Sequence, residues 1–209
     1  MSKILLLNGS PHKDGCIATA LKEMITVFEK EGFEYELIEI GSRTIRGCID
    51  CRYCMSHGKC AFDDDPVNEI AAKLKDADGL VIGSPVYYAS PNATLIALLD
   101  RLMFSTDYSK QFKVGAAVVS ARRGGASSTF DVLNKYFTNQ NMPIASSTYW
   151  NSVHGFTAED VLKDPEGLQT MRNLANNIVF MVRAFADARE KYGVPEVETA
   201  AFTSFQDGK

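Results

Sequence analysis

The sequence predicts an α/β fold in which helices cover both faces of a five-stranded parallel sheet. Short apolar runs of strand length alternate with longer stretches of helical periodicity along the 209 residues. This alternation is typical of parallel strands joined by right-handed helical crossovers. No internal repeat or low-complexity segment interrupts it. We therefore expect a three-layer α/β/α sandwich with the strand order 2-1-3-4-5.

The first two strands are expected on either side of a helix. The apolar run KILLLN at 3–8 predicts a buried strand, and a helix is expected over about 15–31. The stretch FEYELIEI at 33–40 alternates apolar and polar residues, which predicts the second strand. Beyond a cysteine-rich stretch, Asp65 and Pro66 predict a helix start, as its N-cap and its first helical residue.

The second half of the chain continues the same alternation. Its expected elements are, in order, a strand at 79–83 (GLVIG), a helix at about 93–104, a strand at 113–120 (KVGAAVVS), a helix at 130–140 (FDVLNKYFTNQ), a strand at 142–150 (MPIASSTYW) and a helix at about 165–192. The last helix carries an apolar stripe at helical spacing, which predicts that one side of it is buried.

We expect one domain over residues 1–209, with a cysteine-rich excursion at about 41–65 and a tail after 193 that forms an arm against a neighbouring subunit. A net charge of −4 and the lack of any Lys/Arg-rich block argue against nucleic-acid binding. No apolar run is long and unbroken enough for a membrane span or a signal peptide. The cytoplasm is therefore the expected compartment.

Ligands of such sheets bind beyond the carboxyl ends of the strands, so the loops after the first, third and fourth strands are the candidate site. The first loop, NGSPHKDGC, lacks the glycine spacing of dinucleotide and nucleoside-triphosphate loops. Its Gly-Ser-Pro turn before a helix still predicts a nest of N–H groups for a single phosphate. Ser10 can add a hydroxyl, and His12 or Lys13 can add charge. An ordinary strand-to-helix turn is the alternative.

The other two loops suit a flat ring. In GSPVYYASPN, the side chains of Val86, Tyr87 and Tyr88 offer planar apolar surface. In SARRGGASS, small residues permit close approach of a ligand, and Arg122 and Arg123 bring positive charge. Each loop alone is explained as well by ordinary packing or a solvated turn. Together, the three loops favour a phosphorylated planar cofactor, with FMN as the leading candidate.

The motifs NGSPHKDG, GSPVYYASP followed by LLDR, and SARRGG resemble those of the flavodoxin-fold NADPH-dependent FMN reductases. The resemblance extends nearly from end to end, through NSVHG and EGLQTMRNLANN. It implies FMN as cofactor and NAD(P)H as co-substrate. The residues that it implies for FMN are Ser10, His12 and the amides of Gly15, Cys16, Ile17 and Ala18 for the phosphate, with Pro85, Val86, Tyr87 and Tyr88 on one side of the ring and Ser120, Ala121, Arg122, Arg123, Gly124 and Gly125 on the other. One departure is that Cys16-Ile17 stands where the family often has Asn-Thr, which removes two polar phosphate partners.

Four of the five cysteines lie within thirteen residues, in the pattern C-x2-C-x2-C-x5-C. The C-x2-C-x2-C core is that of ferredoxin-type clusters, because a two-residue gap points successive thiolates at one centre. Zinc, with His57 as a spare ligand, and free thiols that act as a redox switch are alternatives. The stretch resembles that of the archaeal-type iron–sulfur flavoproteins, which implies a [4Fe–4S] cluster near the flavin. Its ligands would be Cys48, Cys51, Cys54 and Cys60.

The fifth cysteine, Cys16, is expected to be a small packing residue at the phosphate loop. No side chain is predicted to be catalytic, because in flavin chemistry the cofactor carries the reaction.

The predicted function is an FMN-dependent NAD(P)H oxidoreductase that reduces a flavin, a quinone or another small electron acceptor. The first alternative is an iron–sulfur flavoprotein that carries electrons between partner proteins, such as a ferredoxin-like protein. The second alternative is a non-catalytic thiol sensor, which leaves the three loops unexplained. The resemblance also implies a homodimer or homotetramer. A flavin ring held only by one subunit's loops would be rather exposed, so the long excursion at 41–65 is expected to cover a neighbour's site.

Overall fold

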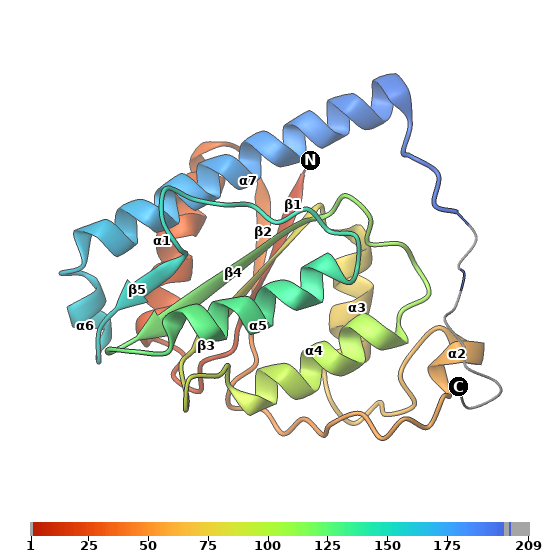
Figure 1. The fold of residues 1–209 in the computed structure, drawn as a ribbon, viewed down its shortest axis with the longest axis horizontal. Helices are drawn as coiled ribbons and strands as arrows, with labels where there is room; N and C mark the ends of the chain where they lie inside the picture. The colour runs from red at the N-terminus through yellow and green to blue at the C-terminus, as the bar shows by residue number, and fades with distance from the viewer. Residues whose placement is uncertain (1, 199–200, 202–209) are drawn as a thin grey trace, which may run out of the picture.

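The computed structural model describes residues 2–198 and 201 of the chain. Its sheet has five strands, and every neighbouring pair is parallel. The order β2-β1-β3-β4-β5 confirms the predicted topology (Figure 1). The strands are β1 (Lys3–Asn8), β2 (Glu34–Glu39), β3 (Gly79–Pro85), β4 (Val114–Ala121) and β5 (Ser152–His154).

Helices form a layer on each face of the sheet, as expected (Figure 1). One face is covered by α1 (Cys16–Lys30), α6 (Ala158–Val161) and α7 (Pro165–Tyr192), and the other by α3 (Val67–Asp76), α4 (Ala93–Ser105) and α5 (Ala126–Thr138). The short helix α2 (Cys54–His57) lies outside these layers, in the cysteine-rich segment. That segment leaves the end of β2 and runs along α4 (Figure 1).

The central strand β1 is apolar throughout because both of its faces are buried. Ile4 and Leu6 pack into the core under α1 and α7, whereas Leu5 and Leu7 pack into the core under α3, α4 and α5. All four side chains are fully buried. This strand therefore joins the two cores and places its carboxyl end, Asn8, at the centre of one edge of the sheet.

The fifth strand was expected at 142–150, and that prediction is wrong. The only pairing described there is an isolated bridge between Ile144 and Gly115, in which Gly115 donates to the Pro143 carbonyl and accepts from the Ala145 N–H. Regular pairing begins at Ser152, opposite Val119. From the bridge to the start of β5 the chain advances eight residues, Ile144 to Ser152, whereas β4 advances only four, Gly115 to Val119. Pro143 lacks an N–H group for a ladder bond, and the polar run from Ser146 to Thr148 has no apolar side chain to bury.

The tail was predicted to begin after 193. Residues 194–198 are irregular and exposed, and the Gln111 side chain donates to the Pro195 carbonyl at 3.2 Å. Most of the remaining tail lies outside the described residues, so the predicted arm stays a prediction. No helix in the described part of the chain combines the length and the apolar composition needed to cross a membrane.

The loop after β2 passes so close to the loop after β1 that only glycine fits at position 41. A Cβ atom on Gly41 would lie 2.2 Å from the backbone carbonyl carbon of Ser10 and 2.4 Å from the carbonyl oxygen of Gly9. Backbone atoms cannot yield as a flexible side chain can. The geometry of the first loop therefore depends on the absence of a side chain at residue 41.

We predict that Gly41→Ala destabilises the protein by about 1–3 kcal/mol, the usual cost of forcing an atom into a packed site. The matched control is Gly47→Ala in the same segment, where a Cβ would meet nothing within 4 Å. The control should stay within about 0.5 kcal/mol of the parent protein. Urea unfolding measures both free energies, and equal values for the two variants would contradict the prediction.

Candidate functional site

The loops after β1, β3, β4 and β5 enclose a cleft at the carboxyl edge of the sheet. Its volume is about 820 Å³, which suits a small-molecule ligand. The lining residues are Ser10, His12, Lys13, Asp14, Gly15, Cys16, Pro85, Val86, Tyr87, Ser120, Ala121, Arg122, Gly155, Phe156, Thr157, Ala158 and Glu159. The cleft therefore lies where the parallel topology predicts a ligand site.

The start of α1 faces this cleft and is built to receive an anion. Gly15 is its N-cap and contributes no side-chain hydrogen bond, and the first turn holds no acidic residue. Within the described residues, the N–H groups of Cys16, Ile17 and Ala18 have no hydrogen-bond acceptor. Free N–H groups at the positive end of a helix dipole form a phosphate site.

Buried polar groups hold the first loop in place. The Asn8 side-chain oxygen accepts from the Ser10 N–H at 3.0 Å, and the Ser10 hydroxyl accepts from the His12 N–H at 3.1 Å. From the other side, the Asn92 amide at the start of α4 donates to the Gly9 carbonyl at 2.7 Å. These bonds order the backbone before any ligand binds.

Glu39, at the end of β2, supports the same loop because its carboxylate accepts from the Asn8 side chain at 2.7 Å. Partial burial raises the pKa of Glu39 above its usual value, against the lowering effects of the Asn8 bond and of the charge on Lys13. The surroundings of Glu39 therefore favour its neutral form over its carboxylate.

The loop after β3 contains a strained turn. Tyr87 and Ser90 exchange both backbone hydrogen bonds, at 2.9 and 3.0 Å, so that Tyr88 and Ala89 form the tip with φ values of 51° and 58°. Left-handed backbone is unfavourable for side-chain-bearing residues and often marks functional loops. Gly125 packs against this tip, where a Cβ would lie 2.9 Å from the Ala89 Cα.

The structure brings ten of the sixteen predicted flavin-site residues to the cleft lining: Ser10, His12, Gly15, Cys16, Pro85, Val86, Tyr87, Ser120, Ala121 and Arg122. Ile17 and Ala18 reach the site only through their backbone, since their side chains are fully buried in the core. The remaining four, Tyr88, Arg123, Gly124 and Gly125, do not line the cleft. The Tyr88 side chain is fully exposed, at the tip of its turn.

Sequence reasoning missed the segment 155–159, which forms one wall of the cleft. This segment directly follows β5, so the rule that placed the other loops would have found it if the strand had been predicted at 152–154 rather than 142–150. Thr157 and Asp160 form a reciprocal capping box that shapes the segment and starts α6.

Cys16 links this wall to α1. Its thiol lies 3.3 Å from the Thr157 carbonyl oxygen. Partial burial raises the pKa of Cys16, and the nearby carboxylates of Asp160 and Glu159 add to the effect. A protonated thiol is a poor nucleophile, which agrees with the expected packing role.

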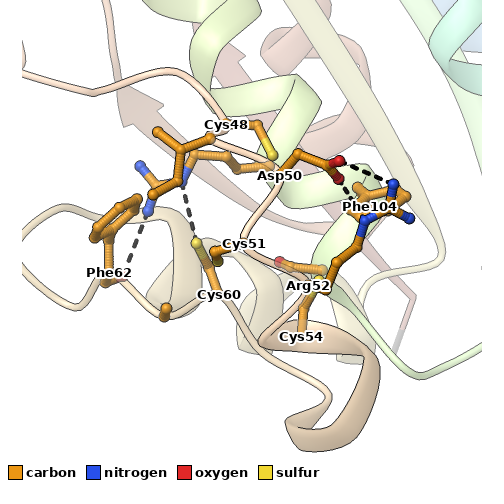
Figure 2. A pocket seen from close by; sticks show the side chains of 12 residues that line it. Cys48, Asp50, Cys51, Arg52, Cys54, Cys60, Phe62 and Phe104 are labelled. Atoms are coloured by element: carbon orange, nitrogen blue, oxygen red, sulfur yellow. Dashed lines mark hydrogen bonds and ion pairs between the residues drawn. The ribbon is translucent and has the colours of Figure 1, made fainter.

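The other four cysteines line a second, small pocket (Figure 2). Cys48 and Cys51 are exposed, Cys54 is half-buried and Cys60 is buried, and all are free thiols. The remaining wall is formed by Ile49, Asp50, Arg52, Ala61, Phe62, Arg101, Phe104 and Ser105. The cavity measures about 20 Å³, the space of about one water molecule.

The three exposed or half-buried thiols belong to one loop with unusual backbone geometry. Asp50 and Arg52, on either side of Cys51, both have positive φ values, 51° and 61°. Their side chains form an ion pair at 2.7 Å that closes over this strained turn. The turn places Cys51 on the pocket wall together with Cys48 and Cys54 (Figure 2).

As a ligand type, the four thiols suit a metal centre, because four cysteines commonly ligate [4Fe–4S] clusters and structural zinc. Their spacing is not that of a preformed ligand set: the described residues contain no group of three or more Cys, His, Asp or Glu side chains close enough to hold a metal ion. A metal centre on these four thiols would therefore need the segment from Cys48 to Cys54 to rearrange so that the sulfurs converge.

The cysteine pocket and the cleft lie at opposite ends of α4. The helix begins after Asn92, which is bonded to Gly9 at the cleft, and Arg101 and Phe104 near its other end line the cysteine pocket. Its 13 residues span about 20 Å at 1.5 Å per residue. Within a single chain the two sites are therefore separated by α4, so the predicted approach of the cysteines to the flavin would have to be completed by a neighbouring subunit and stays a prediction.

Comparison with known proteins agrees with this fold. Residues 2–157 match the NADPH-dependent FMN reductase family. An iron–sulfur flavoprotein of Methanocaldococcus jannaschii is 32% identical to this chain over 189 residues, which cover 87% of this chain and 97% of that protein. One from Archaeoglobus fulgidus is 30% identical over 202 residues, which cover 90% of this chain and 97% of that protein.

Solved structures show the same flavodoxin-like fold. RosB with bound 8-demethyl-8-formylriboflavin-5′-phosphate has a TM-score of 0.71 at 15% identity, over 99% of this chain and 92% of that chain. A flavodoxin from the Archaea has a TM-score of 0.59 at 14% identity, over 88% of this chain and 99% of that chain.

We predict that Glu39→Gln raises the melting temperature at neutral pH. Glutamine stays neutral, and its side-chain oxygen can still accept from Asn8. In the parent protein, ionisation of Glu39 costs stability at neutral pH, and this cost disappears as pH falls through its raised pKa. The difference in melting temperature should therefore shrink on acidification. Thermal unfolding across a pH series measures it. Glu34→Gln, at the exposed start of β2, is the control and should show no such convergence.

Proposed function

Because this chain belongs to the NADPH-dependent FMN reductase family and is close to the iron–sulfur flavoproteins, we propose that it is an FMN-dependent oxidoreductase that takes electrons from NAD(P)H. The observation that carries the proposal is the start of α1, whose free N–H groups open into the cleft. Ser10 and the strand-end loops surround that helix start. When bound, FMN accepts a hydride from a nicotinamide and returns the electrons singly or as a pair.

The residues of the cleft suggest how FMN would be held. The phosphate would lie against the free N–H groups of Cys16, Ile17 and Ala18, with the Ser10 hydroxyl beside it, whereas the Gly15 N–H already donates to the His12 carbonyl. The ring would lie between the segments 85–87 and 120–122, and the wall at 155–159 would limit access of water. Lys13 and Arg122, which also line the cleft, provide positive charge for the phosphates of NAD(P)H.

We further propose a [4Fe–4S] cluster on Cys48, Cys51, Cys54 and Cys60, because four free thiols line one pocket. Free thiols suit a reducing compartment, and we propose the cytoplasm. Zinc or an unmetallated thiol switch would be the outcome if the purified, anaerobic protein contained no iron. Analysis for iron, zinc and sulfide, together with a visible spectrum, distinguishes these cases.

We also propose a homodimer or homotetramer, because the cysteine pocket and the cleft lie at opposite ends of α4 within one chain. Electron transfer over the length of α4 is slow compared with transfer across an interface that brings one chain's cysteine pocket to another chain's cleft. Both regions carry exposed apolar side chains: Tyr87 and Tyr88 by the cleft, and Ile49, Met55 and Phe104 by the cysteines. A monomeric mass by light scattering at micromolar concentration would contradict this proposal.

The second candidate function is electron transfer between partner proteins, such as a ferredoxin-like protein. It is favoured by the exposure of Cys48 and Cys51, which leaves one side of the cysteine pocket open to a docking protein. Steady-state oxidation of NADH and NADPH by the purified, FMN-loaded protein, with flavin and quinone acceptors, separates the two candidates. Turnover supports the reductase, whereas reduction only by a partner protein supports the carrier.

We predict that Ser10→Ala weakens FMN binding by roughly 1–2 kcal/mol, the scale of a hydrogen bond to a charged group. The matched control is Ser109→Ala. The Ser109 hydroxyl accepts from the N–H of Gln111, the same turn contact that Ser10 makes with His12. Fluorescence titration with FMN measures both dissociation constants. An unchanged value for Ser10→Ala would show that this hydroxyl does not contact the phosphate.

We predict that Cys51→Ala greatly reduces iron uptake and the broad visible absorbance after anaerobic reconstitution, because the loop then lacks its central ligand. Cys16→Ala is the control, since Cys16 lines the cleft instead of the cysteine pocket. It should retain the iron of the parent protein. Equal iron content in the two variants would rule out Cys51 as a ligand.

A further inference from the structure

The cysteine pocket contains a buried cation, Arg101, that no part of the proposed flavin chemistry uses. Its side chain is 1% exposed and reaches the pocket from the last turns of α4. It forms an ion pair with Asp65, which is also buried, at 3% exposure. Burial of a charge costs folding free energy unless hydrogen bonds and an opposite charge compensate it, so loss of any one of its partners would destabilise the fold.

The donors of Arg101 are shared among several acceptors. One terminal nitrogen donates to Asp65 and to the Arg46 carbonyl, and the other lies 3.4 Å from the Phe62 carbonyl oxygen. The remaining donor, Nε–H, donates to the Cys60 sulfur at 3.2 Å, a bond drawn as the dashed line that ends at the labelled Cys60 in Figure 2. A planar guanidinium can serve these acceptors at once because its five N–H groups have fixed directions.

A second side chain fixes the backbone of Cys60. The Asn68 side chain, on α3, accepts from the Cys60 N–H and donates to the Cys60 carbonyl, both at 3.0 Å. Cys60 is therefore held from α3 through its backbone and from α4 through its sulfur. The three other cysteines lie on the exposed loop with the strained turn at Asp50 and Arg52.

We propose that Arg101 positions Cys60 as the fixed ligand of the cysteine centre and raises the reduction potential of that centre through its N–H group. This inference rests on the proposed iron–sulfur function. Reduction adds negative charge to a cluster and its sulfur ligands, and a cationic N–H donor to a ligand sulfur stabilises that charge. Because Cys60 is fixed and the pocket is small, the loop from Cys48 to Cys54 is the part that moves to admit the metal.

The alternative role for Arg101 is purely structural, as the partner of buried Asp65. Two sets of variants separate the roles. Arg101→Lys keeps a positive charge for Asp65 but has no N–H at the position of Nε. The double variant Arg101→Met with Asp65→Asn removes both charges, so that no buried carboxylate is left unpaired. Arg183→Lys is the matched control. Arg183 lies on α7, away from the cysteine pocket, and also forms an ion pair with a carboxylate, that of Glu31, at 3.0 Å.

The first measurement uses the reduced, metal-free protein under anaerobic conditions. Each cysteine is alkylated with N-ethylmaleimide, and its rate is followed by peptide mass spectrometry. The limiting rate of the thiolate is taken from a pH series, so that a change in ionisation is separated from a change in access. We expect Arg101→Lys to accelerate this limiting rate for Cys60 about tenfold, because loss of a hydrogen bond to the sulfur frees the side chain. Cys48, Cys51 and Cys54 should keep their rates, whereas general unfolding would accelerate all four. The control should leave every rate unchanged.

The second measurement uses protein that has been reconstituted with iron and sulfide and is then titrated with dithionite. Both Arg101 variants should show a lower midpoint potential than the parent protein, while Arg183→Lys should not. A purely structural role does not predict a shift in protein that has folded and taken up the same amount of iron. A shift in midpoint potential therefore reports the hydrogen bond that the Arg101 Nε–H donates to the Cys60 sulfur.

Unchanged Cys60 alkylation in Arg101→Lys would overturn the positioning role, and an unchanged midpoint potential in both variants would overturn the effect on the potential. If the parent protein takes up no iron, the iron–sulfur part of the proposed function fails on its own. Alkylation then still decides the positioning role: selective acceleration at Cys60 supports it, and equal rates overturn it.

Discussion

The hydrogen bonds around the end of β1 are the constraint on which the functional edge of this molecule depends. Asn8 is fully buried, holds the Ser10 N–H with its side-chain oxygen, and is itself bonded by Glu39 from the neighbouring strand. Asn92 holds the next carbonyl, that of Gly9. Asn8 and Glu39 are paired in the sheet, and Asn92 is fixed as the cap of α4. The chain therefore turns into α1 at one defined position. The free N–H groups of that helix therefore face the cleft rather than solvent.

The helix α4 connects this edge to the cysteine-rich segment. Its cap, Asn92, belongs to the network at the cleft, whereas Arg101 belongs to the cysteine pocket. The apolar side of α4 is buried against the sheet, so the helix cannot shift without disturbing the core. The two sites are thus held apart within a chain, at opposite ends of one helix that is packed into the core. Such an arrangement suits a protein whose electron path crosses a subunit interface.

The cysteine pocket is asymmetric, and its two sides have different physical origins. Cys60 is buried and bonded to side chains of two core helices, so it has the rigidity of the core. Cys48 and Cys51 are exposed, on a loop whose left-handed residues are closed by the ion pair between Asp50 and Arg52. In the metal centre that we propose, Cys60 would therefore be the fixed ligand and the exposed segment from Cys48 to Cys54 would adjust to it.

The sequence by itself determined the topology, the carboxyl edge as the site and the clustering of four cysteines, because these follow from periodicity, parallel connections and local spacing. It misplaced β5, because pairing at the edge of a sheet depends on which backbone groups the neighbouring strand offers, as Gly115 and Val119 do here. For the same reason it missed the wall at 155–159. Only the tertiary structure decided that Arg101, 41 residues from Cys60, donates to its sulfur. Contacts between residues so far apart in the chain depend on how the helices pack, and no local pattern records them.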